Sequence, residues 1–283
     1  MLKTAFIDPI VKIALHEDIG AGDITTLNVI PRTLHIKAAI IAGQKGILCG
    51  VSVAERVFRL ADENLRYLPA AKDGDVLERG REIAYIEGSA QHILSAERTA
   101  LNFISHLSGV ATKTRTFVDK IKGTGARILD TRKTTPGLRI LEKYAVSVGG
   151  GKNHRFGLYD QVLIKDNHLL IMRKRSIPDI VADVRKSVLK KTVIGVEVKN
   201  LMEFQAALKS SADYILLDNM QPETVRGAVN LKKRQNSKIE LEVSGGVTID
   251  TVLEYAQTGV ERISIGALTH SVQAIDISLD IVG

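Results

Sequence analysis

The sequence predicts an α/β protein whose second half is a parallel sheet covered by helices. From about residue 126, short and nearly continuous apolar runs alternate with amphipathic stretches, as is typical of strands buried on both faces. Most runs end in a polar residue or glycine, and from Glu197 these ends follow at steps of 21, 26 and 22 residues. Such ends meet at one mouth in an α/β barrel, whereas a doubly wound sheet gathers them at one switch point. We therefore expect a barrel, and an incomplete one because eight strands are not visible.

The first 112 residues mix short strands with helices. Residues 35–48 predict a strand, a turn and a second strand, with glycines as the breakers. Residues 51–62 place their apolar side chains on one helical face, and residues 95–122 have the spacing of one long helix or two shorter ones. Residues 74–87 alternate and turn at Gly80, which predicts a hairpin.

The predicted strands of the second half are six short apolar runs. They lie at 126–131, 161–166, 193–198, 214–219, 240–245 and 262–267. The last four are separated by helix-like stretches at 200–211, 222–235 and 248–258. The tail 275–281 alternates, a pattern that fits a strand returning to the sheet of the first domain.

Composition limits the class of protein. The chain has 283 residues, of which 45% are hydrophobic and 25% charged, so it is neither disordered nor fibrous. Its only cysteine, Cys49, rules out an intramolecular disulfide and a cysteine-based zinc cluster. No run of 18 apolar residues predicts a membrane span. The first twenty residues carry Asp8 and Lys12 within their apolar stretch and lack a signal core, so we expect a cytoplasmic protein.

The net charge of +7, from 39 basic and 32 acidic residues, suggests an anionic partner. Nucleic acid is disfavoured because aromatic residues are only 4% and tryptophan is absent. The basic runs 173–175 and 232–234 lie in polar, helix-like stretches and read as solvated helix faces. What remains is an enzyme or a binding protein for small, highly charged anions.

Two acidic residues end adjacent strands of the predicted barrel, Glu197 in VEVKN and Asp218 in LLDNM. A single acid at a strand end is usually a helix cap or a salt-bridge partner. Two on neighbouring strands favour function. They could hold Mg²⁺, which prefers one or two carboxylates plus substrate phosphate oxygens, or stabilise a cationic sugar transition state.

Basic residues lie on three elements of the same mouth. Arg132 and Lys133 leave one strand, Lys165 ends another, and the triple-glycine loop 149–151 is followed by His154 and Arg155. Arginine presents a planar fork that suits carboxylate or phosphate, and glycines let backbone amides approach an anion. Together these elements predict a polyanionic ligand.

Glycine-bearing ends of the last two strands predict a phosphate cradle. Ser244, Gly245 and Gly246 end one strand, and Gly266 ends the next, shortly before His270. In α/β barrels the loops after the last strands, with a short helix N-terminus, often hold a phosphate group.

Nine short motifs are spread along nearly the whole chain. They are EDIGAGDITT (17–26), ERTALNF (97–103), DTRKTTPGLR (130–139), GGGKNHRFGLYD (149–160), IKDNH (164–168), VEV (196–198), LLDN (216–219), SGG (244–246) and SIGALTHS (264–271). In this order they resemble the motifs of the quinolinate phosphoribosyltransferase family, nearly end to end. A small departure is Val243, where alanine is expected before Ser-Gly-Gly.

The resemblance implies an N-terminal α/β sandwich at 1–112, to which the tail 271–283 returns, and a TIM-like α/β barrel of fewer than eight strands at 113–270 that carries the active site. It implies transfer of phosphoribosyl from phosphoribosyl pyrophosphate to quinolinate with decarboxylation, which gives nicotinate mononucleotide, pyrophosphate and carbon dioxide, as in NAD biosynthesis. It also implies Mg²⁺ and a homodimer in which Arg98 reaches the neighbouring subunit's site.

Site residues follow by resemblance. The quinolinate pocket would consist of Arg98, Arg132, His154, Arg155 and Lys165. The phosphoribosyl pyrophosphate site would consist of Lys133, Glu197, Asp218, Ser244, Gly245, Gly266 and His270. Lys133, Lys165, Glu197 and Asp218 would be catalytic, and the last two would also hold the metal, directly or through water.

Three alternatives remain open on the residues alone. A related protein associated with molybdenum transport shares some of these motifs. Lys165 at a strand end could form a Schiff base, as in barrel lyases. A nucleic-acid binder is suggested only by the net charge, and its cations would be expected in one exposed stripe.

Overall fold

The computed structural model describes residues 2–282, which form two compact units. Unit 1 consists of the chain up to Arg115, the segment Thr134–Gly150 and the chain from Leu268 onward. Unit 2 consists of Thr116–Lys133 and Gly151–Ala267. Each unit has its own sheet and its own core, and the candidate site lies in unit 2.

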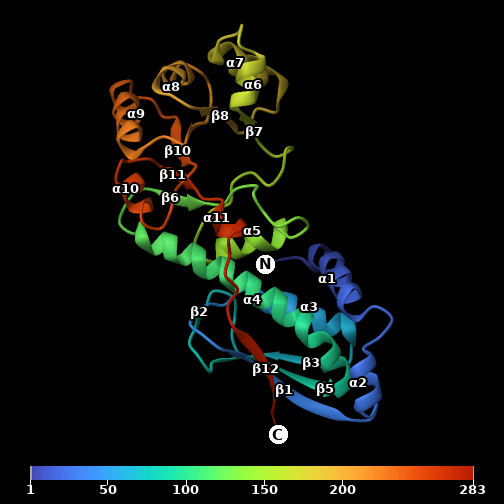
Figure 1. Cartoon of the computed structure of the whole chain (residues 1–283). Helices are drawn as coiled ribbons and strands as arrows, with labels where there is room; N and C mark the ends of the chain where they lie inside the picture. The colour runs from blue at the N-terminus through green and yellow to red at the C-terminus, as the bar shows by residue number, and fades with distance from the viewer. Residues whose placement is uncertain (1, 283) are drawn as a thin grey trace. The chain divides into compact units, whose positions relative to one another are not determined.

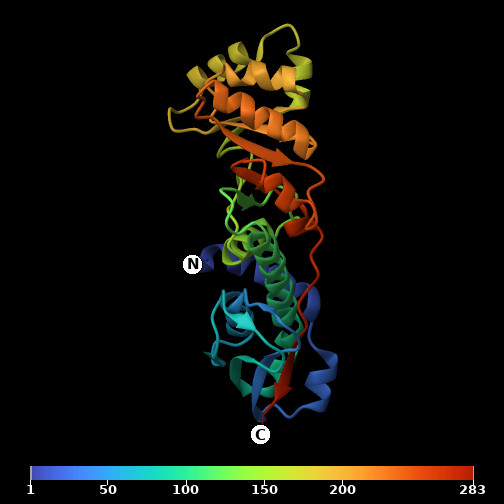
Figure 2. The same cartoon turned by 90° about the vertical axis from the view of Figure 1, so that its left-hand side faces the viewer.

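Unit 1 contains an antiparallel sheet with the strand order β12-β1-β5-β3. These strands are β1 His35–Ala42, β3 Arg66–Pro69, β5 Glu82–Ser89 and β12 Ile277–Ile281. The C-terminal strand β12 pairs with β1 from Ala38↔Ile281 to Ala42↔Ile277. On its way back the chain runs beside α4, where the amide of Ile275 donates to the carbonyl of Ser105 (Figure 2).

The hairpin predicted over residues 74–87 is wrong. Strands do lie on both sides of Gly80, but β4 (Val76–Leu77) pairs with β2 (Gly46–Ile47), not with β5. β5 instead pairs with β1 and β3 along its length. The long β1–β5 pairing buries Ile83, Ala84 and Ile86, which a two-strand hairpin would leave partly in water.

The helices of unit 1 follow from local sequence signals. Helix α3 begins at Val51, the first residue of the segment predicted to be helical, and buries its Val and Phe face. Residues 95–120 of the predicted stretch 95–122 lie in one long helix rather than two. Asp23 caps the N-terminus of α2 by accepting from the amides of Thr25 and Thr26. The helices are α1 Thr4–Ile19, α2 Ile24–Val29, α3 Val51–Ala61, α4 Ala90–Lys120, which continues into unit 2, and α5 Arg139–Val148.

Unit 2 contains a parallel sheet of six strands, as predicted. Each strand is shorter than the apolar run that predicted it. The strands are β6 Arg127–Leu129, β7 Val162–Ile164, β8 Ile194–Val198, β9 Tyr214–Asp218, β10 Glu240–Ser244 and β11 Arg262–Ser264. Their central residues are almost fully buried, as expected of strands covered on both faces.

The strand order β7-β8-β9-β10-β11-β6 is that of a barrel with one missing pairing. Strands follow one another in chain order, and β6 lies beside β11, where a closed barrel would have its first strand meet its last. No reversal of strand order occurs within the described sheet, so it lacks the switch point of a doubly wound fold. The incomplete barrel that the sequence predicts is confirmed, and it is open between β6 and β7.

Helices follow the strands of unit 2 around the outside of the sheet (Figure 1). Predicted stretches 200–211 and 222–235 correspond to α8 and α9, whereas 248–258 contains only the short helix α10. The helices are α6 Asp166–Ile171, α7 Ile177–Ser187, α8 Leu201–Leu208, α9 Pro222–Arg234, α10 Val252–Ala256 and α11 Ala267–His270, whose last residues belong to unit 1. Among the described residues, no helix has both the length and the apolar character needed to cross a membrane.

Candidate active site

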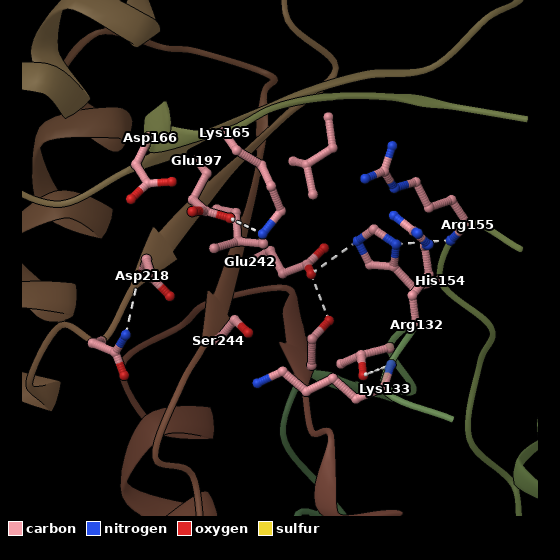
Figure 3. A pocket seen from close by; sticks show the side chains of 15 residues that line it. Arg132, Lys133, His154, Arg155, Lys165, Asp166, Glu197, Asp218, Glu242 and Ser244 are labelled. Carbon is pink, nitrogen blue, oxygen red and sulfur yellow. Dashed lines mark hydrogen bonds and ion pairs between the residues drawn. The ribbon is translucent and has the colours of Figure 1, made fainter. Parts of the chain in front are cut away.

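A pocket of about 430 Å³ opens at the carboxyl edge of the parallel sheet, and every residue that lines it belongs to unit 2. Figure 3 shows Arg132, His154 and Arg155 on one side of it, Asp166, Glu197 and Asp218 on the other, and Glu242 between the two groups. The lining residues are Thr131, Arg132, Lys133, His154, Arg155, Leu163, Lys165, Asp166, Glu197, Leu216, Asp218, Asn219, Glu242, Ser244 and Ser264.

The acidic side of the pocket is built from strand ends. Glu197 is the fourth residue of β8 and is 6% exposed, and Asp218 is the last residue of β9. Ser244 ends β10 in register with Asp218, and Ser264 ends β11 in register with Ser244. Because parallel strands bring their carboxyl ends to one edge, these polar side chains share one pocket. The sequence predicts this for Glu197, Asp218 and Ser244, but not for Ser264.

The glycine loop reaches the pocket along the free edge of β6. Lys152 exchanges backbone hydrogen bonds with Ile128 and Asp130, which extends β6 by a short bridge. The buried carboxylate of Asp130 then accepts from the amide of His154 at 2.8 Å. This edge pairing places His154 and Arg155 in the gap of the incomplete barrel.

Two arginines of the pocket repel each other. Burial lowers the pKa of the Arg155 guanidinium, and the positive charge of Arg132 lowers it further. The Nη1 of Arg155 donates to the carbonyl of Gln161 at 3.2 Å, which holds the side chain in place. An anion bound in the pocket that both guanidiniums line would offset this repulsion, so the charge on this side favours a negatively charged ligand.

Lys165 lies between the basic and acidic sides. Its Nζ is 3.2 Å from Oε2 of Glu197, and its side chain is 48% exposed while that of Glu197 is 8% exposed. The Nδ1 of His168 accepts from the amide of Lys165 at 2.9 Å. His168 therefore orients the start of α6.

Gly245 permits a close backbone approach. Its φ is +94°, a conformation that favours glycine, and a Cβ there would lie 2.2 Å from Oδ1 of Asn219. The backbone amide of Asn219 donates to the carbonyl of Ser244, and its side-chain Nδ2 donates to the carboxylate of Asp218. The Ser-Gly-Gly turn thus packs against a pocket residue on the neighbouring strand.

The pocket brings together eight of the twelve predicted site residues: Arg132, Lys133, His154, Arg155, Lys165, Glu197, Asp218 and Ser244. The other four do not line it. Gly245 and Gly266 follow β10 and β11 in unit 2, while Arg98 on α4 and His270 at the end of α11 belong to unit 1.

Sequence reasoning missed several lining residues. The sequence prediction covers the polar or glycine residues that end the apolar runs, and Glu242 and Ser264 each lie two residues before such an end. Side chains two residues apart on a strand share a face, so Ser244 at the pocket implies Glu242 at the pocket. That periodicity could have found Glu242. The same two-residue spacing places Leu216 on the face of Asp218 and Leu163 on the face of Lys165.

Fold and pocket together define an α/β-barrel enzyme that acts on a multiply charged anion. The model of the quinolinate phosphoribosyl transferase C-terminal domain matches residues 110–280, and that of the N-terminal domain matches residues 23–108. The chain belongs to the quinolinate phosphoribosyl transferase family.

Relatives that match nearly the whole chain agree with this family assignment. A probable nicotinate-nucleotide pyrophosphorylase (carboxylating) of Bacillus subtilis is 43% identical over 265 residues, which is 94% of this chain and 90% of the relative. One from Methanocaldococcus jannaschii is 43% identical over 279 residues, 96% of each chain. The solved nicotinate-nucleotide pyrophosphorylase of Ehrlichia chaffeensis is 42% identical with a TM-score of 0.90, covering 97% of this chain and 98% of that one.

Proposed function

We propose that this pocket transfers phosphoribosyl from phosphoribosyl pyrophosphate to the ring nitrogen of quinolinate. The activity is that of a carboxylating nicotinate-nucleotide pyrophosphorylase, in NAD biosynthesis. The observation that carries the residue roles is the pairing of two arginines on one side of a single pocket with two strand-end carboxylates on the other. The first side suits a dicarboxylate and the second suits a ribosyl group whose C1′ becomes positive.

Quinolinate would bind on the basic side. Arg132 and Arg155 provide guanidinium forks, and Lys165 adds a cation at the boundary. His154, which is 8% exposed, forms part of the same wall. We extend the quinolinate site to Arg98 of a second copy of the chain, in a homodimer, which is the proposed assembly.

Phosphoribosyl pyrophosphate would bind across the acidic side. Lys133 and Lys165 would contact the pyrophosphate, and Glu197 and Asp218 the ribose hydroxyls. The 5′-phosphate would lie on the loops after β10 and β11, where Ser244, Gly245, Gly266 and, from α11, His270 provide hydroxyl, amide and imidazole donors. The supporting observation is the positive φ of Gly245 and Gly246, with open space at the Cβ position of Gly246, because glycines let backbone amides approach an anion.

Mg²⁺ fits the acidic side as a partner of the substrate. Within the described residues no cluster of three or more acidic, histidine or cysteine groups could hold a metal by itself. Glu197 and Asp218 offer two carboxylates, the number that Mg²⁺ takes from a protein when phosphate oxygens complete its shell. A bound Mg²⁺ would neutralise part of the pyrophosphate charge.

The bond changes follow from this arrangement. The nitrogen lone pair of quinolinate forms the bond to C1′ while the C1′–O bond to pyrophosphate breaks, and the carboxylates of Glu197 and Asp218 stabilise the positive charge at C1′. The ring is then cationic, so the adjacent C2–carboxylate bond breaks to release carbon dioxide and leaves its electron pair on C2. A proton from water completes nicotinate mononucleotide. Positioning suffices here, and we expect no dedicated decarboxylation base.

A cytoplasmic location is also part of the proposal. Cys49, the only cysteine of the sequence, is buried and free, which suits a reducing compartment.

The alternatives fit less well. A Schiff base requires a neutral amine, but Lys165 is held in an ion pair with Glu197. The relatives named above are carboxylating pyrophosphorylases and not molybdenum-linked proteins. The pocket gathers Arg132, Lys133, Arg155 and Lys165, whereas a nucleic-acid binder is expected to present its cations in an exposed stripe.

The test is a paired assay with Mg²⁺ and phosphoribosyl pyrophosphate, in which either quinolinate or nicotinate is the acceptor. We expect pyrophosphate and carbon dioxide in equal amounts with quinolinate alone. Consumption of nicotinate at a similar rate, or pyrophosphate release without carbon dioxide, would contradict the proposal. Accumulation of the dicarboxylated nucleotide in a single-site variant would show that decarboxylation needs its own catalytic group.

A further inference from the structure

Glu242 is a fully buried carboxylate in the wall of the pocket, and the reaction above gives it no role. It is the third residue of β10, two positions before Ser244 on the same face. Burying a carboxylate is costly unless cations and hydrogen-bond donors surround it. Its partners therefore indicate what it does.

Three side chains meet the Glu242 carboxylate from neighbouring elements. Oε1 lies 3.2 Å from Nε2 of His154 and accepts from the hydroxyl of Ser264. Oε2 lies 2.7 Å from Nε of Arg262, which also stacks over the ring of Tyr214 at 4.3 Å. These three contacts surround a carboxylate that is fully buried.

Both ring nitrogens of His154 face groups of the protein (Figure 3). The amide of Arg155 donates to Nδ1 at 2.7 Å, so Nδ1 is an acceptor and carries no proton. The ring proton then lies on Nε2, which faces Glu242 and also lies 3.3 Å from the hydroxyl of Tyr214. Burial raises the pKa of Tyr214, and the Glu242 charge raises it further, so this hydroxyl stays protonated.

We propose that Glu242 is a positioning residue that holds His154 as its neutral Nε2–H tautomer and, through Nδ1, fixes the backbone of Arg155. This inference rests on the proposed function, because it assigns the Arg155 guanidinium to the quinolinate carboxylates. His154 then contributes orientation to the quinolinate site and not positive charge. Arg262 balances Glu242 from the far side, so the buried carboxylate does not cancel the cations that the substrate dianion needs.

The first measurement is nitrogen-15 NMR of histidine-labelled wild-type protein at neutral pH. The His154 signals are assigned by their loss in His154→Asn. We expect one protonated and one unprotonated ring nitrogen, with the proton on Nε2. A doubly protonated ring, or a proton on Nδ1, would overturn the proposal. This reading needs no substrate, so it is independent of whether quinolinate is consumed.

The second measurement compares two variants of similar volume. Glu242→Gln keeps an oxygen acceptor for Nε2–H, so we expect the tautomer to persist and the KM for quinolinate to change less than about threefold. Glu242→Met removes the acceptor, and we expect that KM to rise about tenfold, the equivalent of one lost hydrogen bond. The KM for phosphoribosyl pyrophosphate should change less than about threefold in both.

The matched control is Glu240→Gln on the same strand. Glu240 contacts Arg262 at 3.4 Å from outside the pocket and has no contact with His154 among its described ion pairs. We expect its two KM values to stay at wild-type levels. A parallel rise of both KM values in Glu242→Met, or an equal effect of Glu240→Gln, would mean that Glu242 is merely structural. If Glu242→Met does not fold, the KM for quinolinate of Glu242→Gln and the nitrogen-15 spectrum of the wild-type protein still test the proposal. Absence of quinolinate turnover in wild-type protein would contradict the proposed function and leave the NMR result standing.

Discussion

At the residue scale, the proposed quinolinate site depends on the shape of its cations as much as on their number. Arg155 is held by a backbone carbonyl, loses water on burial and is repelled by Arg132. A guanidinium constrained in this way presents its fork in one orientation, and a carboxylate can accept two parallel hydrogen bonds from it. A lysine in its place would keep the charge but not the fork.

Arg155→Lys should therefore weaken quinolinate binding while leaving the other substrate nearly unaffected. We expect the KM for quinolinate to rise about tenfold to a hundredfold, the equivalent of one or two lost charge-assisted hydrogen bonds. Steady-state kinetics with each substrate varied in turn measures this. Arg226→Lys, at an exposed position on α9, is the control and should match wild type. An unchanged KM for quinolinate in Arg155→Lys would remove Arg155 from the site.

Individual residues also show where sequence reasoning stops. Glu197 and Asp218 could be found because they lie at or next to the carboxyl ends of strands, and the structure places both in the pocket. The tautomer of His154 could not, because it depends on a carboxylate 88 positions away in the chain, Glu242, and on the amide of the next residue. Strand periodicity brings Glu242 to the pocket face, but only coordinates show what it touches.

At the element scale, the turn after β10 is limited by its backbone. Gly245 combines positive φ with a Cβ position that the Asn219 side chain fills. Gly227, inside α9, has an ordinary helical φ, and a Cβ there would meet nothing within 4 Å. The two glycines thus differ in backbone φ and in the space at the Cβ position, and these two properties decide whether alanine is tolerated.

Gly245→Ala should destabilise the protein by about 1–3 kcal/mol, because the side chain forces both strain and a shift of Asn219. Gly227→Ala should stabilise it by about 0.5–1 kcal/mol, because alanine loses less backbone freedom in a helix. Urea unfolding of the two variants beside wild type measures both free energies. Equal effects with the same sign would contradict the turn geometry.

Helix α2 offers a pH-dependent test of a cap. Hydrogen bonds from Thr26, side chain first and amide second, lower the pKa of Asp23 below 3.8. A lowered pKa in the folded state stabilises the helix at pH values above 3.8, and the stabilisation is lost as the pH falls through the folded pKa. Asp23→Ala should cost about 1 kcal/mol at neutral pH, and Asp23→Asn, which can still cap, should cost less.

Hydrogen exchange of the α2 amides measures the free energy of local opening of this helix. The difference between wild type and Asp23→Ala should shrink steadily as the pH drops below 3.8, while the difference between Asp23→Asn and Asp23→Ala should persist. A gap between wild type and Asp23→Ala that stays constant down to strongly acid pH would mean that the Asp23 charge contributes nothing to the cap.

Elements differ in how well the sequence predicts them. The six barrel strands are predicted because each is apolar on both faces and separated from the next by a helix or a glycine loop. The pairing over 74–87 is not predicted correctly, because an alternating pattern identifies strands but not their partners. In the structure β5 pairs with β1 and β3 over longer stretches. Pairing between distant strands is a property of the whole sheet.

At the scale of the whole molecule, the central question is whether one chain forms a complete site. The proposed quinolinate pocket includes Arg98, which lies in α4 of unit 1, and we assign its contribution to a second copy of the chain. In a twofold dimer each site would then contain residues of both chains. This arrangement can be tested without a structure of the dimer.

Arg98→Ala and Lys165→Ala should each reduce activity about a hundredfold, because each removes a charged contact to substrate. Mixing the two variants after dissociation and reassociation should restore activity to about a quarter of wild type, since half of the dimers are mixed and each has one intact site. The readout is carbon dioxide release as a function of mixing ratio. No recovery in any mixture, or a fully active monomer, would contradict a shared site.

The pairing of β12 with β1 has a consequence for how the protein is made. A nascent chain leaves the ribosome N-terminus first, so β1 emerges long before β12, and the edge from Ala38 to Ala42 stays unpaired while the intervening residues are synthesised. During that interval the barrel strands of unit 2 emerge in order and can pair with near neighbours, whereas the β1 edge is open to pairing with another nascent chain. Contacts between such distant segments also form slowly. Translation that pauses before residue 277 should therefore favour aggregation through unit 1, and chaperones that shield strand edges should act on this protein during synthesis.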